Sequence, residues 1–201
     1  EQNGARFKGH SDTEVFLAAL EAWGLEKSLA KVSGMFAFAL WDAKEHTIHF
    51  ARDPLGKKPL YLGWMGGTLL FGSELKSLRA HPAFKAEIDM RGLDQYLRYG
   101  WLNAPLSIYK GVVQLKPGHV LSLTQAQLQK REDLLPRMKA YWRPLDIVRD
   151  AIPKPKNVDY VDEFNTLLSI CVNDRMVSDV PLGAFLSGGI DSSTVVALMQ
   201  K

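Results

Sequence analysis

The sequence predicts an α+β part followed by the beginning of an α/β part. Short apolar segments, separated by polar or glycine-containing turns, fill residues 34–124, as in antiparallel sheets with helices packed on them. A charged stretch with prolines at 136, 144, 153 and 155 follows. After it, a helical pattern, an apolar segment and a glycine-rich turn lead into another helix-like run. We therefore expect a first domain over residues 1–125, a linker over 126–157 and the beginning of a second domain over 158–201.

The first helix is predicted to begin at Ser11. Residues 11–14 read Ser-Asp-Thr-Glu, which is the S-x-x-E pattern of a capping box. In that motif the serine accepts a hydrogen bond from the amide three residues on, and Glu14 bonds back to the amide of Ser11. An apolar-rich run follows over residues 15–23, and Gly24 is the expected stop.

Several strands and short helices are expected next. Residues 35–41 are apolar at every position, which predicts a strand buried on both faces. A polar turn leads to a second strand over 47–52. The segments 59–65 and 68–72 flank Gly66-Gly67, a pair typical of hairpin turns. Helices are expected over 74–79 and 90–99, and one or two further strands over 112–124.

An amphipathic helix is predicted over residues 159–177, because Val161, Phe164, Leu168 and Cys171 recur at helical spacing. Cys171 is the only cysteine, so no intramolecular disulfide can form, as expected in a reducing, cytoplasmic setting. On the apolar face of a helix it is expected to be a buried structural residue rather than a nucleophile.

Composition argues against nucleic-acid and membrane partners. The net charge is +3, and 25 basic residues are scattered among 22 acidic ones without a basic stripe. No segment approaches the roughly 20 apolar residues of a membrane span. The chain begins at Glu1 without a leader pattern and stops in a helix-like run, so we expect it to belong to a longer protein.

The strongest functional pattern is the Ser-Gly-Gly-Ile-Asp-Ser-Ser turn at residues 187–193, between an expected strand over 182–186 and a helix. Glycines let a ligand approach the backbone, and the free amides and dipole of a helix start attract anions such as phosphates. Asp191 would repel a bare phosphate, so it indicates either a magnesium ion between them or hydrogen bonds to the loop's own amides. The alternative is a turn that merely caps a helix, which is equally common on spacing alone. Its place after an apolar strand favours ligand binding.

Other polar residues have structural alternatives. Asp12 in the first helical turn suits either ligand binding or interaction with the helix dipole. Arg52 and Asp53 are expected to form an ion pair that braces the loop to Pro59. The histidines form no metal-ligand pattern, and no metal ligand is assigned.

The turn at 187–193 resembles the S-G-G-x-D-S/T loop of ATP pyrophosphatases. Together with residues 178–186 it resembles the asparagine synthetases in particular. The resemblance implies that Leu186 lines the nucleotide site and that the Ser-Gly-Gly amides hold pyrophosphate. The implied ATP-binding residues are Leu186, Ser187, Gly188, Gly189, Asp191 and Ser192.

Residues 9–15 are similar to the segment of class II glutamine amidotransferases in which an aspartate holds the amino group of glutamine, so Asp12 is the implied glutamine-binding residue. Residues 34–42, 52–61 and 71–76 resemble later parts of that domain. The implied fold is a truncated α-β-β-α sandwich of the N-terminal-nucleophile hydrolases. The first strand and helix of an adenine-nucleotide α-hydrolase-like parallel sheet would follow it.

The resemblance implies a ligase that makes asparagine from aspartate with glutamine as nitrogen donor, through aspartyl-AMP, with release of AMP and pyrophosphate. ATP and Mg²⁺ are the implied cofactors, and a homodimer of the whole protein stays open. The family's N-terminal cysteine nucleophile is absent, so no catalytic residue is assigned and this chain alone is expected to be inactive. Two rivals stay open. One is an amidotransferase acting on another carboxylate, such as a cell-surface sugar or β-lactam-type precursor, and the other is a non-catalytic relative.

Overall fold

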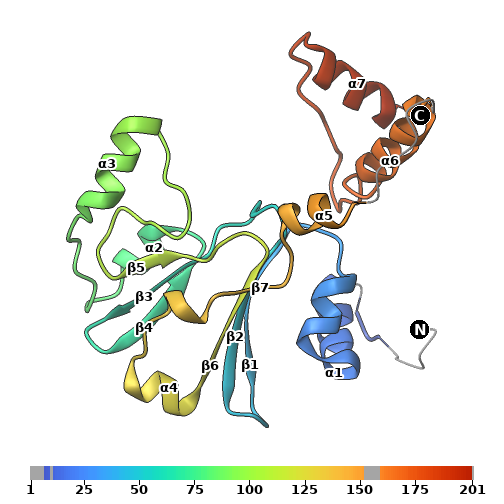
Figure 1. Ribbon diagram of the computed structural model, residues 1–201. Coiled ribbons are helices and arrows are strands. Elements are labelled where there is room, and N and C mark those ends of the chain that lie inside the picture. Colours follow the sequence, from blue (N-terminus) through green and yellow to red (C-terminus); the bar gives the residue numbers. More distant parts are fainter. Residues whose placement is uncertain (1–6, 10, 152–158, 201) are drawn as a thin grey trace. The chain divides into compact units, whose positions relative to one another are not determined.

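The computed structural model describes residues 7–9, 11–151 and 159–200, and the chain divides into two compact units, residues 1–150 and 151–201 (Figure 1). The helices of the first unit are α1 (Asp12–Lys31), α2 (Leu75–Arg79), α3 (Met90–Tyr99), α4 (Gln125–Lys130), the 3-10 helix η1 (Leu135–Arg137) and α5 (Pro144–Asp150). Its strands are β1 (Ala37–Asp42), β2 (Thr47–Arg52), β3 (Tyr61–Met65), β4 (Thr68–Gly72), β5 (Val112–Gln114), β6 (His119–Thr124) and β7 (Lys139–Ala140). The second unit contains α6 (Val161–Asn173) and α7 (Ile190–Met199).

Two antiparallel sheets form the centre of the first unit, one in the order β1-β2-β6-β7 and the other in the order β4-β3-β5. The expected hairpin is confirmed, since β3 pairs with β4 around Gly66 (φ 56°) and Gly67 (φ 92°). Positive φ at both central residues is what such a two-residue turn requires, and glycine adopts it without strain. Helix α3 has the predicted bounds. Asp89 caps its start and Gly100 (φ 75°) ends it.

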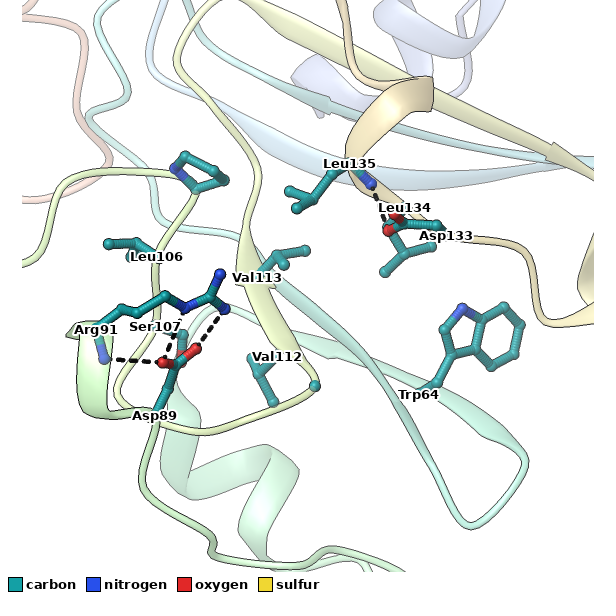
Figure 2. A pocket seen from close by; sticks show the side chains of 12 residues that line it. Trp64, Asp89, Arg91, Leu106, Ser107, Val112, Val113, Asp133, Leu134 and Leu135 are labelled. Atoms are coloured by element: carbon teal, nitrogen blue, oxygen red, sulfur yellow. Dashed lines mark hydrogen bonds and ion pairs between the residues drawn. The ribbon is translucent and has the colours of Figure 1, made fainter. Parts of the chain in front are cut away.

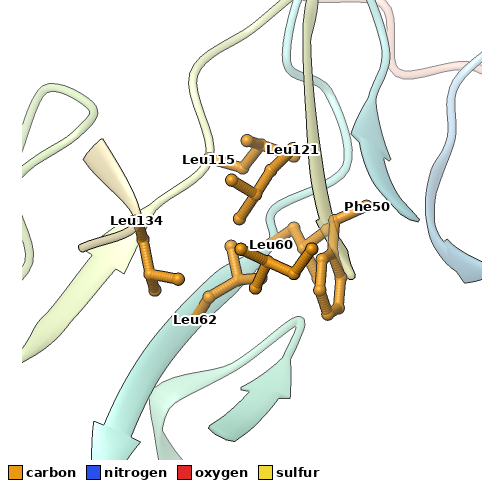
Figure 3. Packing of buried hydrophobic residues seen from close by; sticks show 7 residues of the cluster. Phe50, Leu60, Leu62, Leu115, Leu121 and Leu134 are labelled. Carbon is orange, nitrogen blue, oxygen red and sulfur yellow. The ribbon is translucent and has the colours of Figure 1, made fainter. Parts of the chain in front are cut away.

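The two sheets share one hydrophobic core and therefore pack face to face. Phe50 of β2 and Leu121 of β6 contribute from the first sheet, and Leu62 of β3 from the second (Figure 3). All three side chains are completely buried. The rings of Phe50 and Phe71 meet edge to face across the sheets, with centroids 5.1 Å apart. Burying such large side chains supplies most of the favourable free energy of folding of this unit.

Helices cover the outer faces of both sheets. In β3, Met65 points away from the shared core and packs with Leu78 of α2. In β1, Phe38 is opposite Ala51, on the face away from the core because side chains alternate along β2. The ring of Phe16 in α1 lies 5.1 Å from that of Phe38. The layer order is thus α1, first sheet, second sheet, α2, which confirms the α+β class and the four-layer arrangement expected for this part.

Two expectations for the first elements need correction. Helix α1 begins as predicted with Ser11 as N-cap, but Gly24 (φ 76°, ψ 171°) only interrupts it, and helix continues to Lys31. Strand β1 forms, yet it is not buried on both faces, since Met35 just before it and Trp41 within it are each 49% exposed. The reason is that β1 is an edge strand of its sheet, so neighbouring elements cover only part of it.

The beginning of the expected linker packs with the first unit. Leu134 is buried in the shared core, and β7 pairs with β6 at Val120 and Lys139. Helix α4 begins with a capping box between Thr124 and Gln127, a T-x-x-Q signal that the sequence does contain. Residues 152–158 of the expected linker lie outside the described residues. The division into 1–125, 126–157 and 158–201 stays a prediction, but these contacts show that its middle part does not begin as a free connection.

The second unit confirms two helices and corrects two expectations. Residues 182–186 are not a strand, because a strand needs hydrogen bonds from a neighbour and no strand is found in residues 159–200. Phe185 in this segment is completely exposed. Cys171, expected to be buried, is exposed on α6. Throughout the described part of the chain, no helix is long and apolar enough to cross a membrane.

Candidate glutamine and phosphate sites

Asp12 lies at the first position of α1, beside a cavity of about 330 Å³. Thr13 and Phe16 of the helix line it on one side, and residues 32–38 line it on the other. Thr13 Oγ1 donates a hydrogen bond to Asp12 Oδ1 at 3.3 Å, and the carboxylate is exposed. An exposed carboxylate next to aromatic side chains suits a small ligand that carries an ammonium group.

The segment before α1 is held by Glu14. The amide of Lys8 donates to Glu14 Oε1 at 2.9 Å, and the amide of Gly9 donates to Oε2 at 2.8 Å. Ser11 Oγ accepts a hydrogen bond from the Thr13 amide at 3.2 Å, not from that of Glu14. These hydrogen bonds, that from Lys8 first, lower the pKa of Glu14, so the carboxylate is ionised at neutral pH. The hydrogen bonds therefore differ from those of the expected capping box: Glu14 accepts from the amides of Lys8 and Gly9, and Ser11 accepts from that of Thr13.

The loop after β2 is held by two buried charged residues. Asp53 accepts hydrogen bonds from the amides of Lys57 and Lys58, both at 2.9 Å. Arg52 donates to the carbonyl oxygens of Gly56 and Lys58, at 2.7 and 2.8 Å, and also to that of Leu115. Among the described residues there is no ion pair between Arg52 and Asp53, so the expected pair is wrong although the expected bracing is right. Each charge is satisfied by backbone groups instead, and the loop has a structural role.

The turn at residues 187–191 leads directly into α7, as predicted. Gly189 is the N-cap, and among the described residues no side-chain cap hydrogen bond is formed at this helix start. Ser187 Oγ lies 2.9 Å from Ser192 Oγ, which also donates to the carbonyl of Gly189 at 3.1 Å. Gly188 has φ 77°, and no atom lies within 4 Å of the position that a Cβ would take. The structure thus brings Ser187 and Ser192 together around open glycines, while Leu186 and Asp191 are exposed on either side.

This geometry suits phosphate groups better than a metal ion held by protein alone. Uncapped amides at a helix start are a site for anions, and the glycines leave room for them. Among the described residues no group of three or more His, Cys, Asp or Glu side chains gathers to hold a metal. Mg²⁺ usually binds one or two carboxylates together with substrate phosphates, and Asp191 supplies one carboxylate beside the turn.

Another cavity, of about 280 Å³, lies elsewhere in the first unit and contains no predicted site residue (Figure 2). Its walls are mostly apolar, with Trp64, Leu106 and Val113 among them. The charged Asp89 is bound by the guanidinium of Arg91 through two hydrogen bonds. Asp133, the other carboxylate of the lining, accepts a hydrogen bond from the amide of Leu135 at 3.1 Å. Both carboxylates of this cavity therefore already have hydrogen-bond partners.

Comparison with known proteins assigns the family. The family model for the glutamine amidotransferase domain matches residues 1–142. This chain belongs to that family. A second family model, for asparagine synthase, matches residues 163–201. Asp12 and Glu14 thus lie within the glutamine amidotransferase domain, and residues 187–192 lie within the asparagine synthase match.

Curated relatives are similar over nearly the whole chain. Asparagine synthetase [glutamine-hydrolyzing] 3 of Bacillus subtilis is 35% identical over 200 residues, covering 97% of this chain and 30% of the relative. Amidase chyE of Penicillium rubens is 34% identical over 198 residues, covering 96% of this chain and 27% of the relative. The chain therefore spans less than a third of the length of either protein.

Among solved structures, the allosteric regulatory enzyme of purine biosynthesis aligns with 98% of this chain and 38% of its own, at 18% identity and a TM-score of 0.46. So distant a likeness adds nothing to the amidotransferase assignment.

Proposed function

We propose that this chain is part of a glutamine-dependent asparagine synthetase. The observation that carries the proposal is that one chain joins a glutamine amidotransferase domain to the start of an asparagine synthase match. Similarity to an asparagine synthetase over 97% of the chain supports the same combination. A phosphate-binding turn in the second part would allow such an amidotransferase to activate its acceptor with ATP.

In the proposed reaction, ammonia released from glutamine attacks an aspartate side chain that ATP has converted to aspartyl-AMP. Asp12 would bind the α-ammonium group of glutamine, with its charge opposite that of the ligand. The amides of Ser187, Gly188 and Gly189 would hold the pyrophosphate, and Leu186 would border the nucleotide. Mg²⁺, held by the phosphates with Asp191 and Ser192 nearby, would neutralise charge on the triphosphate. The products would be asparagine, AMP and pyrophosphate.

We also infer a cytoplasmic protein, because a single cysteine suits a reducing compartment. Its substrates would be glutamine, aspartate and ATP. A homodimer of the whole protein stays an open expectation.

A second candidate function is an amidotransferase that acts on a different carboxylate. The similarity to Amidase chyE favours keeping it, because the match is almost as high and as long as that to the asparagine synthetase. The two functions differ in the acceptor alone. Pyrophosphate release that depends on aspartate supports the first, and release that requires another carboxylate supports the second.

The deciding variant is Asp12→Asn in the complete protein, assayed with glutamine or with ammonia. A hydrogen bond to a charged group contributes about 1.5–3 kcal/mol, so the KM for glutamine should rise roughly ten- to a hundredfold. Ammonia bypasses this site, so ammonia-dependent synthesis should stay nearly unchanged. Asparagine is a good residue at a helix start, so α1 should persist. Asp94→Asn, on the exposed surface of α3, is the matched control.

Unchanged use of glutamine by Asp12→Asn would show that Asp12 is only a helix-start residue. Loss of synthesis from both nitrogen sources would show an effect on folding and would leave the binding role without support.

A further inference from the structure

The carboxylate of Glu14 binds backbone amides five and six residues before its own position. Its two oxygens accept from the amides of Lys8 and Gly9, at 2.9 and 2.8 Å. Both amides precede α1, whereas Glu14 is in its first turn. Hydrogen bonds to an ionised acceptor are roughly twice as strong as neutral ones. The result is a clamp, formed by Glu14, Lys8 and Gly9, between the incoming chain and the helix.

This clamp encloses Asp12. Asp12 lies in the sequence between Gly9 and Glu14, which the clamp joins. It therefore belongs to a short segment whose two ends are tied together by the side chain of Glu14. Within the described part of the chain, the side chain of Asp12 is held by the 3.3 Å hydrogen bond from Thr13. The place of its carboxylate therefore depends on the backbone that carries it. The first residues of a helix are the ones that fray most readily, since half of their hydrogen bonds are missing.

We propose that Glu14 is a positioning residue for the glutamine site: it holds the chain before α1 in place and so keeps Asp12 at the edge of its cavity. The inference rests on the proposed binding of glutamine by Asp12. It assigns Glu14 no contact with the substrate. Its role is to lower the mobility of Asp12 before glutamine arrives, which reduces the ordering that binding requires.

A simpler role for Glu14 is to stabilise α1 through attraction to the positive end of the helix dipole, as an acidic residue in the first turn does. That role would affect the stability of α1 but would act independently of Asp12. The two roles are separated by a double-mutant cycle, because residues that act through one another have non-additive effects.

The experiment uses the complete protein with Glu14→Ala, Glu14→Gln, Asp12→Asn and the double variant Asp12→Asn/Glu14→Ala. Glu14→Ala removes both acceptors and should raise the KM for glutamine about tenfold, with kcat and ammonia-dependent synthesis unchanged. Glu14→Gln keeps one acceptor oxygen and nearly the same size, so about a threefold rise is expected. In the Asp12→Asn background, Glu14→Ala should add no further increase. Glu21→Gln, an exposed glutamate later on the same helix, is the control and should behave as the unaltered protein.

If Asp12→Asn raises KM but Glu14→Ala does not, the inference about Glu14 is wrong and the proposed function stands. Effects of the two substitutions that multiply in the double variant would also overturn it, because they would show independent roles. If Asp12→Asn itself has no effect, both the proposed glutamine site and this inference fail. Should Glu14→Ala not fold, the same comparisons are made with Glu14→Gln.

Discussion

The turns at residues 53–58 and 187–191 contain similar residue types and use them in opposite ways. In the first, Asp53 takes up the free amides of Lys57 and Lys58, so the turn is closed by its own side chains. In the second, Asp191 lies in the first turn of the helix, and no side-chain cap is found among the residues that the structure describes. Glycine and aspartate in a turn therefore do not by themselves indicate a ligand site. What matters is whether the amides already have partners.

The same contrast extends to the two units, each taken by itself. Phe50 of the first unit is completely buried between two sheets, whereas Phe185 of the second is completely exposed next to the predicted phosphate-binding turn. The first unit has a core that explains its stability. In the second unit, residues 187–191 of the predicted phosphate-binding turn are exposed.

Phe50→Ala should have the largest effect on stability. Removing a buried phenylalanine costs about 3–5 kcal/mol of the free energy of unfolding, because it leaves a cavity and loses apolar burial. Phe185→Ala is the matched control and should change it by less than about 0.5 kcal/mol. Denaturant unfolding, followed by the fluorescence of the tryptophans in the first unit, measures both. Equal losses in the two variants would contradict the contrast between the units.

Asp191→Ala tests whether the open turn has a functional role. In the complete protein, synthesis from either glutamine or ammonia should fall by about a hundredfold, a loss typical of removing one electrostatic group from a reaction site. Glutamine hydrolysis and the midpoint of thermal unfolding should stay the same, because within the described residues Asp191 is exposed and accepts no backbone hydrogen bonds of the kind that Asp53 does. Pyrophosphate release and glutamate production, measured in parallel, separate the two activities. If glutamine hydrolysis fell and ammonia-dependent synthesis did not, the assignment of Asp191 to the phosphate-binding turn would be wrong.

Asp53→Asn tests the closed turn. Asparagine keeps one acceptor oxygen but replaces the other with an NH₂ group, which cannot accept, so the part-buried amide of Lys57 or Lys58 would lose its partner at a cost of about 2 kcal/mol. Chemical denaturation should show this loss of stability, whereas Asp191→Asn should leave unfolding unchanged. Full stability of Asp53→Asn would mean that the turn does not depend on its carboxylate.

Tyr141 offers a smaller test that depends on pH. Its hydroxyl donates to the carbonyl of Arg52 at 2.7 Å, and burial, followed by the nearby charge of Asp53, raises its pKa. A raised pKa in the folded state means that the stabilisation is present below the unfolded value of about 10 and is lost as pH rises further. Tyr141→Phe should therefore cost about 1 kcal/mol at neutral pH.

Thermal unfolding between pH 8 and 11 should show the difference between the original protein and Tyr141→Phe shrinking above about pH 10. Tyr99→Phe, which alters an exposed tyrosine, is the control. A difference that stays constant with pH would show that ionisation of Tyr141 is not linked to folding.

Local signals in the sequence predicted much of the first unit. Gly66-Gly67 between two apolar segments predicted a hairpin, and the range 90–99 was predicted as a helix. The structure adds that Asp89 and Gly100 cap this helix, because cap geometry depends on a few neighbouring residues. The Ser-Gly-Gly turn and the helix after it were also predicted correctly in position. Tyr141 had no such signal, since its partner is 89 residues away.

By itself, the sequence determined the α+β class of the first part, most of its strands, the start of α1 and the position of the turn before α7, since each follows from periodicity or from residues next to one another. Only the tertiary structure decided that β1 is an outer strand, that Gly24 interrupts α1 without ending it and that residues 182–186 are not a strand. Only the tertiary structure showed that Glu14 binds Lys8 and Gly9, and that Arg52 and Asp53 bind backbone groups instead of each other. The physical reason is the same in each case: burial, strand pairing and the choice among hydrogen-bond partners depend on which groups the fold brings together, and neither composition nor spacing specifies that.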